Sequence, residues 1–425
     1  AALRAVDPYN AVLIQTEHIR SLYRNGKYRK LVIIGFGKAA YAMASAMEDA
    51  FKEETADGVV ITKYGHIPVK SLPDANQERI KIIEAGHPIP DENGVKGTEK
   101  IISLMTGADD ETLVVCLISG GGSALFVAPY EGIPLDDKQK VTELLLKAGA
   151  DIYELNSLRK HISRVKGGRL AEIAYPARIV SLILSDVIGD DVGVIASGPT
   201  APDKTTFHDA IMVLGKYDLM ERAPGRVLKV LQDGDRGAVA ETPKEGNSIF
   251  EHVENIIIGS NSMALAAARQ KAEDMGLCAE IISSGLNGEA REAGRWLGSI
   301  AKRSKDKCVP RRLCLISGGE TTVTVKGNGV GGRNMELALA FALEADGVKG
   351  ITLLSAGTDG TDGPTDAAGA VVDGNTIKRG RAAGLDPDAH LDNNDSYSFF
   401  KRTGELFITG PTGTNVMDIQ IVMIE

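Results

Sequence analysis

The stretch LVIIGFGKAAYAMASAMEDAF, Leu31–Phe51, contains one complete unit of a fold. Its apolar run 31–35 predicts a buried strand that ends in glycine, and the alanine-rich run 38–51 predicts a helix. The same succession recurs, with further predicted strands at 58–62, 80–86, 112–119 and 178–186 and predicted helices at 8–24, 92–106, 136–149 and 151–162. Continuous apolar strands that alternate with helices are typical of a mostly parallel sheet covered on both faces.

A polar stretch without a sustained apolar period, 233–252, divides the chain, and the alternation restarts after it. Predicted strands follow at 255–261, 279–283, 313–319, 321–325, 351–357 and 418–425, and predicted helices end near 275 or span 287–303 and 333–344. We therefore predict an α/β protein of two α/β domains, residues 1–240 and 241–425. The first is expected to be Rossmann-like with a mostly parallel sheet. Because ligands of such proteins bind at strand carboxyl ends or between domains, we expect the site in an interdomain cleft.

The composition excludes some classes of function. The 425 residues carry a net charge of −9 with acidic and basic residues interspersed, which argues against a protein that binds nucleic acid. No signal peptide is recognised and no apolar run reaches the ~18 residues of a membrane span, so a cytoplasmic protein that does not enter a membrane is expected. The four cysteines form no CxxC pair, and we expect free thiols at Cys116, Cys278, Cys308 and Cys314.

The turn GFGKAA, 35–40, places Lys38 at the start of a predicted helix. Free amides at a helix start and a neighbouring cation suit a phosphate or a carboxylate, whereas an ordinary solvated lysine is the alternative. A dinucleotide site matches less well, because the next predicted strand ends ITKYG, 61–65, without the acidic residue that would hold a ribose hydroxyl.

The turn SGGGSAL, 119–125, follows another predicted strand, and its backbone amides could converge on an anion. A nucleophilic serine is disfavoured because residue 125 is leucine, where the elbow motif G-x-S-x-G requires glycine; a turn needed only for close packing is the third interpretation. The letters CLISGG occur twice, at 116–121 and 314–319. We predict nucleotide phosphates at the first copy, contacted by Ser119, Gly120, Gly121, Gly122 and Ser123, and leave the second copy open.

Cations gather in two other segments. The run NSLRKHISRVKGGRLAE, 156–172, is densely basic, and paired glycines follow Lys166. Such a pair indicates a special turn rather than a solvated helix face, so we predict a site for an anionic ligand that includes Lys166. The glycine-rich stretch GNGVGG, 327–332, leads into a predicted helix that starts with Arg333, which resembles a charge clamp on a transferred phosphoryl group.

Oxygen-bearing side chains follow several predicted strands. Asp186 and Asp190 come at the end of the strand 178–186, and Asp359 comes after the strand 351–357. Mg²⁺ generally takes one or two carboxylates together with substrate phosphates, so these aspartates are candidate metal ligands, with turn formation as the alternative. The loop TGPTGTNVMD, 409–418, resembles a phosphate cradle through Thr412 and Asn415. No histidine motif for zinc is present, and His87 is expected to be structural.

Together, these motifs resemble those of the glycerate 2-kinase family, whose C-terminal module is called MOFRL. They occur in the family's order from Ala5 to Val422, with no departure at any of them: GFGKAA, AGHPIPD, SGGGSALF, NSLRKHIS-x-x-KGGRLA, SDVIGDD, SGPT, GGRN-x-E, SAGTDGTDGPT and TGPTGTNV.

The resemblance implies an ATP- and Mg²⁺-dependent kinase that phosphorylates D-glycerate at the 2-hydroxyl. It also implies an active site between two α/β domains, with Lys38 and Arg333 as active-site residues that domain closure would bring to one reacting centre. Asp186 is our first choice for the base that accepts the hydroxyl proton. A hydroxypyruvate reductase that uses NAD(P)H and a non-catalytic sugar-acid-binding module are the alternatives. The oligomeric state stays open, with a homodimer as one option.

Overall fold

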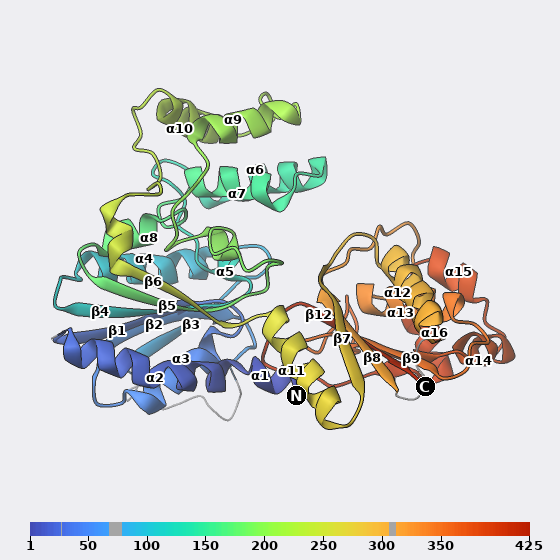
Figure 1. The fold of residues 1–425 in the computed structure, drawn as a ribbon. Coiled ribbons are helices and arrows are strands. Elements are labelled where there is room, and N and C mark those ends of the chain that lie inside the picture. The colour runs from blue at the N-terminus through green and yellow to red at the C-terminus, as the bar shows by residue number, and fades with distance from the viewer. Residues whose placement is uncertain (27, 68–78, 306–311) are drawn as a thin grey trace. The chain divides into compact units, whose positions relative to one another are not determined.

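The computed structural model describes residues 1–425 except 27, 68–78 and 306–311, and the chain forms two compact units (Figure 1). The N-terminal unit comprises Pro8–Ser185 and Asp190–Ile258. The C-terminal unit comprises Ala1–Asp7, Asp186–Gly189 and Gly259–Glu425. The domain ranges 1–240 and 241–425 stay a prediction from the sequence.

The N-terminal unit is built on a six-stranded sheet in the order β3-β2-β1-β4-β5-β6. Its strands are β1 (Lys30–Phe36), β2 (Thr55–Lys63), β3 (Ile80–Ala85), β4 (Thr112–Ile118), β5 (Arg178–Leu184) and β6 (Val253–Gly259). The pairs β2–β3, β1–β2, β1–β4 and β4–β5 are parallel, and every residue of β4 is buried. The strand predicted to open the second half of the chain is β6, and it borders β5 in this first sheet.

Helices cover both faces of this sheet (Figure 1). On one face lie α2 (Pro8–Asn25) and α3 (Ala40–Ala50), whose small and apolar side chains pack on the central strands; on the other lie α4 (Glu92–Thr106), α5 (Gly122–Leu125) and α8 (Arg169–Ala174). The order of strands and the two helical layers are those of a Rossmann-like fold, which confirms the predicted fold class.

A separate group of helices with its own apolar core extends from this sheet. It consists of α6 (Leu135–Ala148), α7 (Ile152–His161), α9 (Phe207–Lys216) and α10 (Gly225–Asp235). Two of them begin with reciprocal capping boxes, Asp151 with Glu154 at α7 and Thr206 with Asp209 at α9. Such caps satisfy amides that a helix start leaves without partners. The short helices η2 (Ile195–Ser197) and η3 (Ser248–His252) lie in connecting segments.

The C-terminal unit contains a second six-stranded sheet in the order β11-β10-β9-β12-β8-β7. Its strands are β7 (Cys278–Leu286), β8 (Leu313–Gly319), β9 (Ile351–Gly357), β10 (Gly369–Asp373), β11 (Leu406–Phe407) and β12 (Asp418–Ile424). The pair β7–β8 is parallel, whereas β12 runs antiparallel to both β8 and β9. The closing strand of the chain therefore lies at the centre of this mixed sheet.

Helices also cover both faces of the second sheet (Figure 1). On one face lie α1 (Ala2–Ala5) and α11 (Asn261–Asp274); on the other lie α12 (Ala290–Lys305), α13 (Arg333–Glu344), α14 (Thr376–Ala382), α15 (Pro387–Asp392) and α16 (Ser396–Thr403). The side chains of α13 are buried from Asn334 to Ala342. The first residues of the chain join this unit, where the Thr414 hydroxyl donates to the carbonyl oxygen of Val6 over 2.8 Å.

The strand predicted at 321–325 is wrong. This segment contains only an isolated bridge between Thr322 and Glu289, and Val325 is 71% exposed. Gly319, with φ +147°, turns the backbone at the end of β8, and the following residues line a pocket instead of joining the sheet. An alternating threonine–valine pattern favours a strand only where a neighbouring strand is available.

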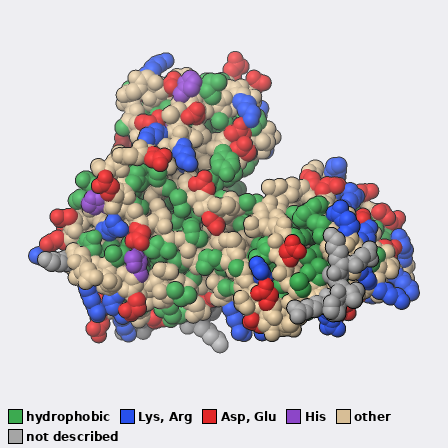
Figure 2. All heavy atoms as spheres, in the orientation of Figure 1, with side chains coloured by type: hydrophobic (Ala, Val, Ile, Leu, Met, Phe, Trp, Pro, Cys, Tyr) green, Lys and Arg blue, Asp and Glu red, His purple; other side chains and the backbone are tan. Residues whose placement is uncertain are grey.

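None of the described helices is long and apolar enough to span a membrane. On the face drawn in Figure 2, basic and acidic side chains are interspersed. Cys116, Cys278 and Cys314 are free thiols as predicted, and Cys308 lies outside the described residues.

Candidate active site

The N-terminal sheet has one topological switch point, between β1 and β4. From β1 the chain continues toward β2 on one side, and from β4 it continues toward β5 on the other. Loops that leave neighbouring strands in opposite directions open a crevice at the strand carboxyl ends, where α/β proteins bind their ligands. Lys38 and the SGGG turn both follow these two strands directly, so the sheet brings together two motifs that the sequence separates.

The two loops are bonded to each other by their backbones. The amide of Lys38 donates to the carbonyl oxygen of Gly120 over 2.8 Å, and the amide of Ala39 donates to the Ser119 hydroxyl over 3.1 Å. Gly37 has φ +132°, and a Cβ atom there would lie 2.2 Å from the Ser119 Oγ atom. The prediction of free amides at this helix start is therefore wrong for residues 38 and 39, because their amides donate to the turn that follows β4. The Lys38 side chain stays available to an anion.

The SGGG turn depends on glycine. Gly121 adopts φ +82° as the residue before α5, and a Cβ atom there would lie 2.9 Å from the His87 ring and 3.3 Å from the Lys38 side chain. The Gly122 amide donates to the carbonyl oxygen of Ser119 over 3.2 Å. The turn therefore lets Lys38 and His87 approach the backbone closely, as an anion-binding turn requires.

Ser123 takes part in a chain of polar side chains. Its hydroxyl lies 2.9 Å from the Ser197 hydroxyl, which donates to Asn156 Oδ1 over 2.9 Å. Ser123 is thus bonded to another serine rather than to a base that could activate it, which agrees with its disfavoured role as a nucleophile.

The β1/β4 switch point is electropositive on the His87 side. Burial, and then the charges of Lys38, Lys63 and His66, lower the pKa of His87 to about 4. A His66 ring nitrogen also lies 3.0 Å from the carbonyl oxygen of Lys38. Because His87 is neutral at pH 7 beside several cations, this edge attracts anions. From its place between a strand and a helix, the sequence allowed His87 to line the cleft but favoured a structural role.

The basic run 156–172 separates into paired and unpaired cations. Lys160 bonds Asp203 over 3.0 Å, and the His161 ring lies 2.8 Å from Glu241. The first pair joins α7 to the segment before α9, and the second joins α7 to the segment after α10. Both pairs are therefore structural. Lys166 differs: its side chain is buried, and its ammonium donates to the carbonyl oxygen of Ala196 over 3.3 Å.

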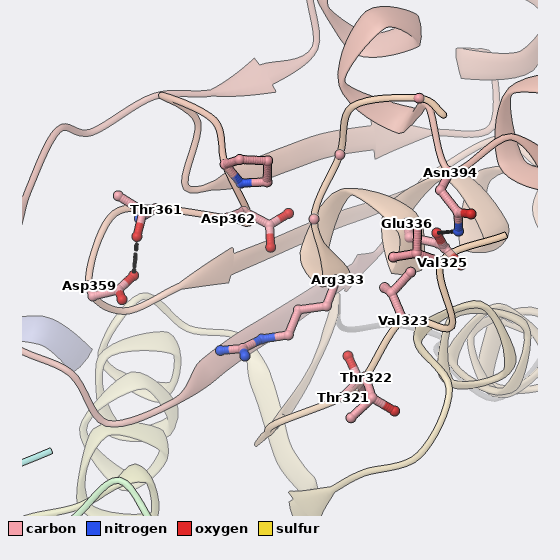
Figure 3. A pocket seen from close by; sticks show the side chains of 15 residues that line it. Thr321, Thr322, Val323, Val325, Arg333, Glu336, Asp359, Thr361, Asp362 and Asn394 are labelled. Carbon is pink, nitrogen blue, oxygen red and sulfur yellow. Dashed lines mark hydrogen bonds between the residues drawn. The ribbon is translucent and has the colours of Figure 1, made fainter. Parts of the chain in front are cut away.

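The C-terminal unit has a pocket of about 640 Å³ beside the start of α13 (Figure 3). Its walls carry hydroxyls, carboxylates and a few apolar side chains, among them Thr321, Val323, Val325, Asp359, Thr361 and Pro364. Arg333 lies on the wall and extends across the view in Figure 3. The segment 321–325 that was predicted to be a strand therefore forms part of this wall.

Arg333 is fixed by two acidic side chains. It bonds Asp418 through two contacts, Nε to Oδ2 at 2.7 Å and Nη2 to Oδ1 at 3.0 Å, and Glu320 at 2.5 Å. These carboxylates and Asp362 raise the pKa of Arg333 despite its partial burial. The Arg333 guanidinium is thus permanently charged and held in one orientation. Glu320, which directly follows the second CLISGG copy, is a partner of Arg333.

Asp362 lies beside the start of α13, in the aspartate-rich loop after β9 for which the sequence left open a role in binding Mg²⁺ or phosphate or in forming turns. Its carboxylate accepts the amides of Asn334 over 3.0 Å and Met335 over 2.8 Å. Burial raises the pKa of Asp362 to about 6, while these two amides oppose the shift. Asp362 therefore caps α13 from a neighbouring loop. In this way it also orients Arg333, the first residue of the helix.

The candidate metal ligands do not form a preassembled site. In the described part of the chain, no group of three or more His, Cys, Asp or Glu side chains could hold a metal ion. Asp359 accepts the amide and hydroxyl of Thr361 in a turn, Asp190 has φ +54°, and Asp186 follows β5 in the segment Asp186–Gly189. This arrangement fits only an ion that arrives with substrate phosphates and takes one or two protein carboxylates.

The candidate phosphate cradle at 409–418 is largely bonded to its own surroundings. The Thr412 hydroxyl donates to the carbonyl oxygen of Thr358, and its amide donates to that of Asp359 over 3.2 Å. Asn415 accepts the amide of Met417 over 3.2 Å. Both side chains therefore shape the loop beside Asp359, and their contact with phosphate stays a prediction.

Comparisons with known proteins are consistent along the whole chain. Residues 1–232 match the family described as "Domain of unknown function (DUF4147)", and residues 313–418 match the MOFRL family. A D-glycerate 2-kinase of Thermotoga maritima is 47% identical over 93% of this chain and 91% of its own length. A crystal structure of glycerate kinase from the same organism has a TM-score of 0.87 at 46% identity, covering 100% of this chain and 97% of that one. A protein of Agrobacterium vitis, provisionally named a hydroxypyruvate reductase, is 44% identical over 100% of this chain and 92% of its own length.

Proposed function

Because this chain belongs to the glycerate kinase family, we propose how its residues carry out the family's reaction. The enzyme is a glycerate 2-kinase: it transfers the γ-phosphoryl group of ATP to the 2-hydroxyl of D-glycerate and releases ADP and 2-phosphoglycerate. Phosphoryl transfer requires little covalent chemistry from a protein and depends on cations and amides placed around the phosphates. The observation that carries the assignment of residues is Lys38 against the SGGG turn at the switch point.

Lys38 and Arg333 have complementary properties. Lys38 is a flexible cation beside Gly121 in an electropositive crevice, which suits a group that follows the phosphoryl during transfer. Arg333 is held rigidly by Asp418 and Glu320, which suits a fixed clamp for charge that develops on the phosphoryl oxygens. We assign both residues to the same reaction, Lys38 from the N-terminal unit and Arg333 from the C-terminal unit.

The proton of the substrate hydroxyl needs an acceptor as the oxygen attacks phosphorus. We assign this role to Asp186, which follows β5. Mg²⁺ would enter with the nucleotide, with Asp359 and Asp190 as further carboxylates for it, and when bound it would neutralise charge on the phosphates. A homodimer, the absence of nucleic-acid binding and a cytoplasmic location remain predictions from the sequence.

The turn between β1 and α3 disfavours the alternative function, a hydroxypyruvate reductase. A dinucleotide would place its pyrophosphate on the free amides at the start of α3. Here the amides of Lys38 and Ala39 are bonded to the turn after β4. In addition, β2 ends at Lys63 and Tyr64 follows it, where an acidic residue would hold the ribose.

The assigned roles can be tested by identifying the product. The wild-type enzyme with ATP, Mg²⁺ and D-glycerate should give the ³¹P NMR signal of 2-phosphoglycerate. Lys38→Ala should keep the wild-type unfolding temperature and lose at least 100-fold in kcat, while the exposed control Lys140→Ala should keep its turnover. Near-normal turnover of Lys38→Ala would refute the role of Lys38, and 3-phosphoglycerate as product would refute the regiochemistry.

A further inference from the structure

Three cations are buried together in the N-terminal unit without a counterion. Lys138 on α6 is 4% exposed, and its ammonium has no hydrogen-bond partner. Lys166, before α8, is 0% exposed and bonds only the carbonyl oxygen of Ala196. Arg159 on α7 is half-buried. Among the described residues, no carboxylate forms an ion pair with any of the three.

These cations lie close enough to repel one another. Burial lowers the pKa of Lys138 to about 7 and that of Lys166 well below its ordinary value, and the charge of Arg159 lowers both further. Burial also lowers the pKa of Arg159 to about 10. Folded proteins rarely keep buried charges unpaired, since the desolvation of each charge destabilises the fold. The cluster is therefore a buried concentration of positive charge without acidic partners, which an anion would stabilise.

The cluster adjoins the SGGG turn through the loop at η2. Lys166 bonds Ala196, and a Cβ atom on Gly122 would lie 2.9 Å from the Ala196 Cβ atom. The amide of Gly167 donates to the carbonyl oxygen of Ser197 over 3.0 Å. Ser197 in turn bonds Ser123, so the glycine turn and the buried cations share one network.

The connecting loop is strained. Ala196, Ser197 and Gly198 have φ angles of 51°, 64° and 62°, three consecutive left-handed residues of which two carry a Cβ atom. Such conformations cost about 1–3 kcal/mol each for residues other than glycine, and they occur where function requires a fixed geometry. Here they aim the carbonyl of Ala196 at Lys166 and the hydroxyl of Ser197 at Ser123.

We propose that Lys138, Arg159 and Lys166 form a polyphosphate subsite for the nucleotide, continuous with the SGGG turn. The proposal rests on the kinase function, which supplies the nucleotide. Up to three positive charges match the several negative charges of a nucleotide polyphosphate, whereas the carboxylate of glycerate carries one. Arg159 is the partly exposed member of the three, and the two buried lysines neutralise the inner oxygens of the anion.

The test uses Lys138→Met and Lys166→Met, which remove charge but keep length. Because each removes an unpaired buried cation, both variants should have unfolding temperatures at or above that of the wild type without ligand. Calorimetry should show at least a tenfold higher Kd for ADP, and kinetics at least a tenfold higher KM for ATP, with the KM for D-glycerate changed less than twofold. Inorganic tripolyphosphate should compete with ATP in the wild type and much less in the variants.

Lys160→Met is the matched control, because Lys160 is a neighbouring buried lysine whose charge is paired with Asp203. It should lower the unfolding temperature and leave the KM for ATP within twofold of the wild type. An unchanged Kd for ADP in both Met variants would overturn the proposal, as would a rise in the KM for D-glycerate alone, which would assign the cations to the carboxylate. Arg159→Met repeats the measurement if a lysine variant fails to fold. A wild type that turns over no ATP would instead refute the kinase function itself.

Discussion

At the residue scale, the charged groups of this enzyme differ mainly in whether they have partners. Arg333 is anchored by Asp418 and Glu320, whereas Lys38 stands beside neutral His87 and a glycine turn. The sequence indicated both cations but not their surroundings. Arg333 and Asp418 are separated by 85 positions, and Ala39 and Ser119 by 80, so only the folded chain brings these groups together.

Removal of Arg333 should affect stability as well as turnover. Asp418 is 1% exposed, and Arg333→Ala would leave its carboxylate buried without its partner, at a cost of about 3 kcal/mol in the free energy of unfolding at pH 7. The loss should shrink at pH 5, since Asp362 and Asp418, whose pKa values burial already raises, can then protonate. Urea unfolding at both pH values measures this effect.

The double variant Arg333→Ala with Asp418→Asn separates the two roles of Arg333. It should recover most of the lost stability, because no unpaired buried charge remains at residue 418, but none of the lost kcat. Recovery of turnover in the double variant would show that Arg333 only positions its neighbours and does not act on the phosphoryl group.

His87 should make the stability of the enzyme sensitive to acid. Its pKa is about 4 in the folded protein and about 6.5 when unfolded, so the unfolded chain binds the proton more readily between these values. The stabilising contribution is complete above pH 6.5 and is lost as the pH falls toward 4. The free energy of unfolding of His87→Gln should therefore decline less over this range than that of the wild type, with exposed His208→Gln as the control. Parallel declines in all three proteins would contradict the half-buried, cation-facing position of His87.

At the element scale, the strands and helices of the N-terminal sheet follow from apolar periodicity, since β1, β4 and β5 are buried runs bounded by glycine or charge. The pattern of apolar residues did not predict the structure of segments whose conformation depends on contacts with distant parts of the chain. Threonine–valine alternation at 321–325 lines a pocket, and β6 joins the first sheet after a polar connection. No helix or strand was predicted between 357 and 418, where β10 and α14–α16 lie. Polar composition marks an exposed connection, but it does not show which sheet the next strand joins.

The contact between the turns that follow β1 and β4 can be tested by replacing a glycine. Gly37→Ala places a Cβ atom 2.2 Å from Ser119 Oγ at a φ of +132°, so the two loops must separate. We expect a loss of about 2 kcal/mol or more in the free energy of unfolding and at least a tenfold loss of kcat/KM for ATP. The control Gly215→Ala on α9 meets open space and should stabilise the protein by about 0.5–1 kcal/mol. An active Gly37→Ala enzyme of wild-type stability would contradict the close contact between the turns after β1 and β4.

At the scale of the whole molecule, the enzyme combines a mostly parallel sheet with a mixed one, and the two cations proposed for phosphoryl transfer, Lys38 and Arg333, belong to different units. The family resemblance of the sequence and the comparisons along the full chain agree on glycerate kinase. The identity of the metal ligands could not be read from the sequence, because Asp at strand ends forms turns as readily as it binds Mg²⁺.

Metal removal should separate catalysis from folding. The described residues contain no preassembled metal group, so EDTA should abolish phosphoryl transfer without lowering the unfolding temperature of the enzyme without nucleotide. Activity should return on addition of Mg²⁺. A large drop in unfolding temperature with EDTA would indicate a structural metal and contradict a nucleotide-borne ion.

We propose that the switch point between β1 and β4 serves phosphoryl transfer and does not bind a dinucleotide. One purified sample should be assayed in parallel with ATP, Mg²⁺ and D-glycerate, by a coupled readout of ADP, and with NADH or NADPH and hydroxypyruvate, by absorbance at the nicotinamide band. We predict D-glycerate-dependent ADP formation and no nicotinamide oxidation above the enzyme-free rate. Oxidation of NADH or NADPH without ADP formation from glycerate would contradict this account.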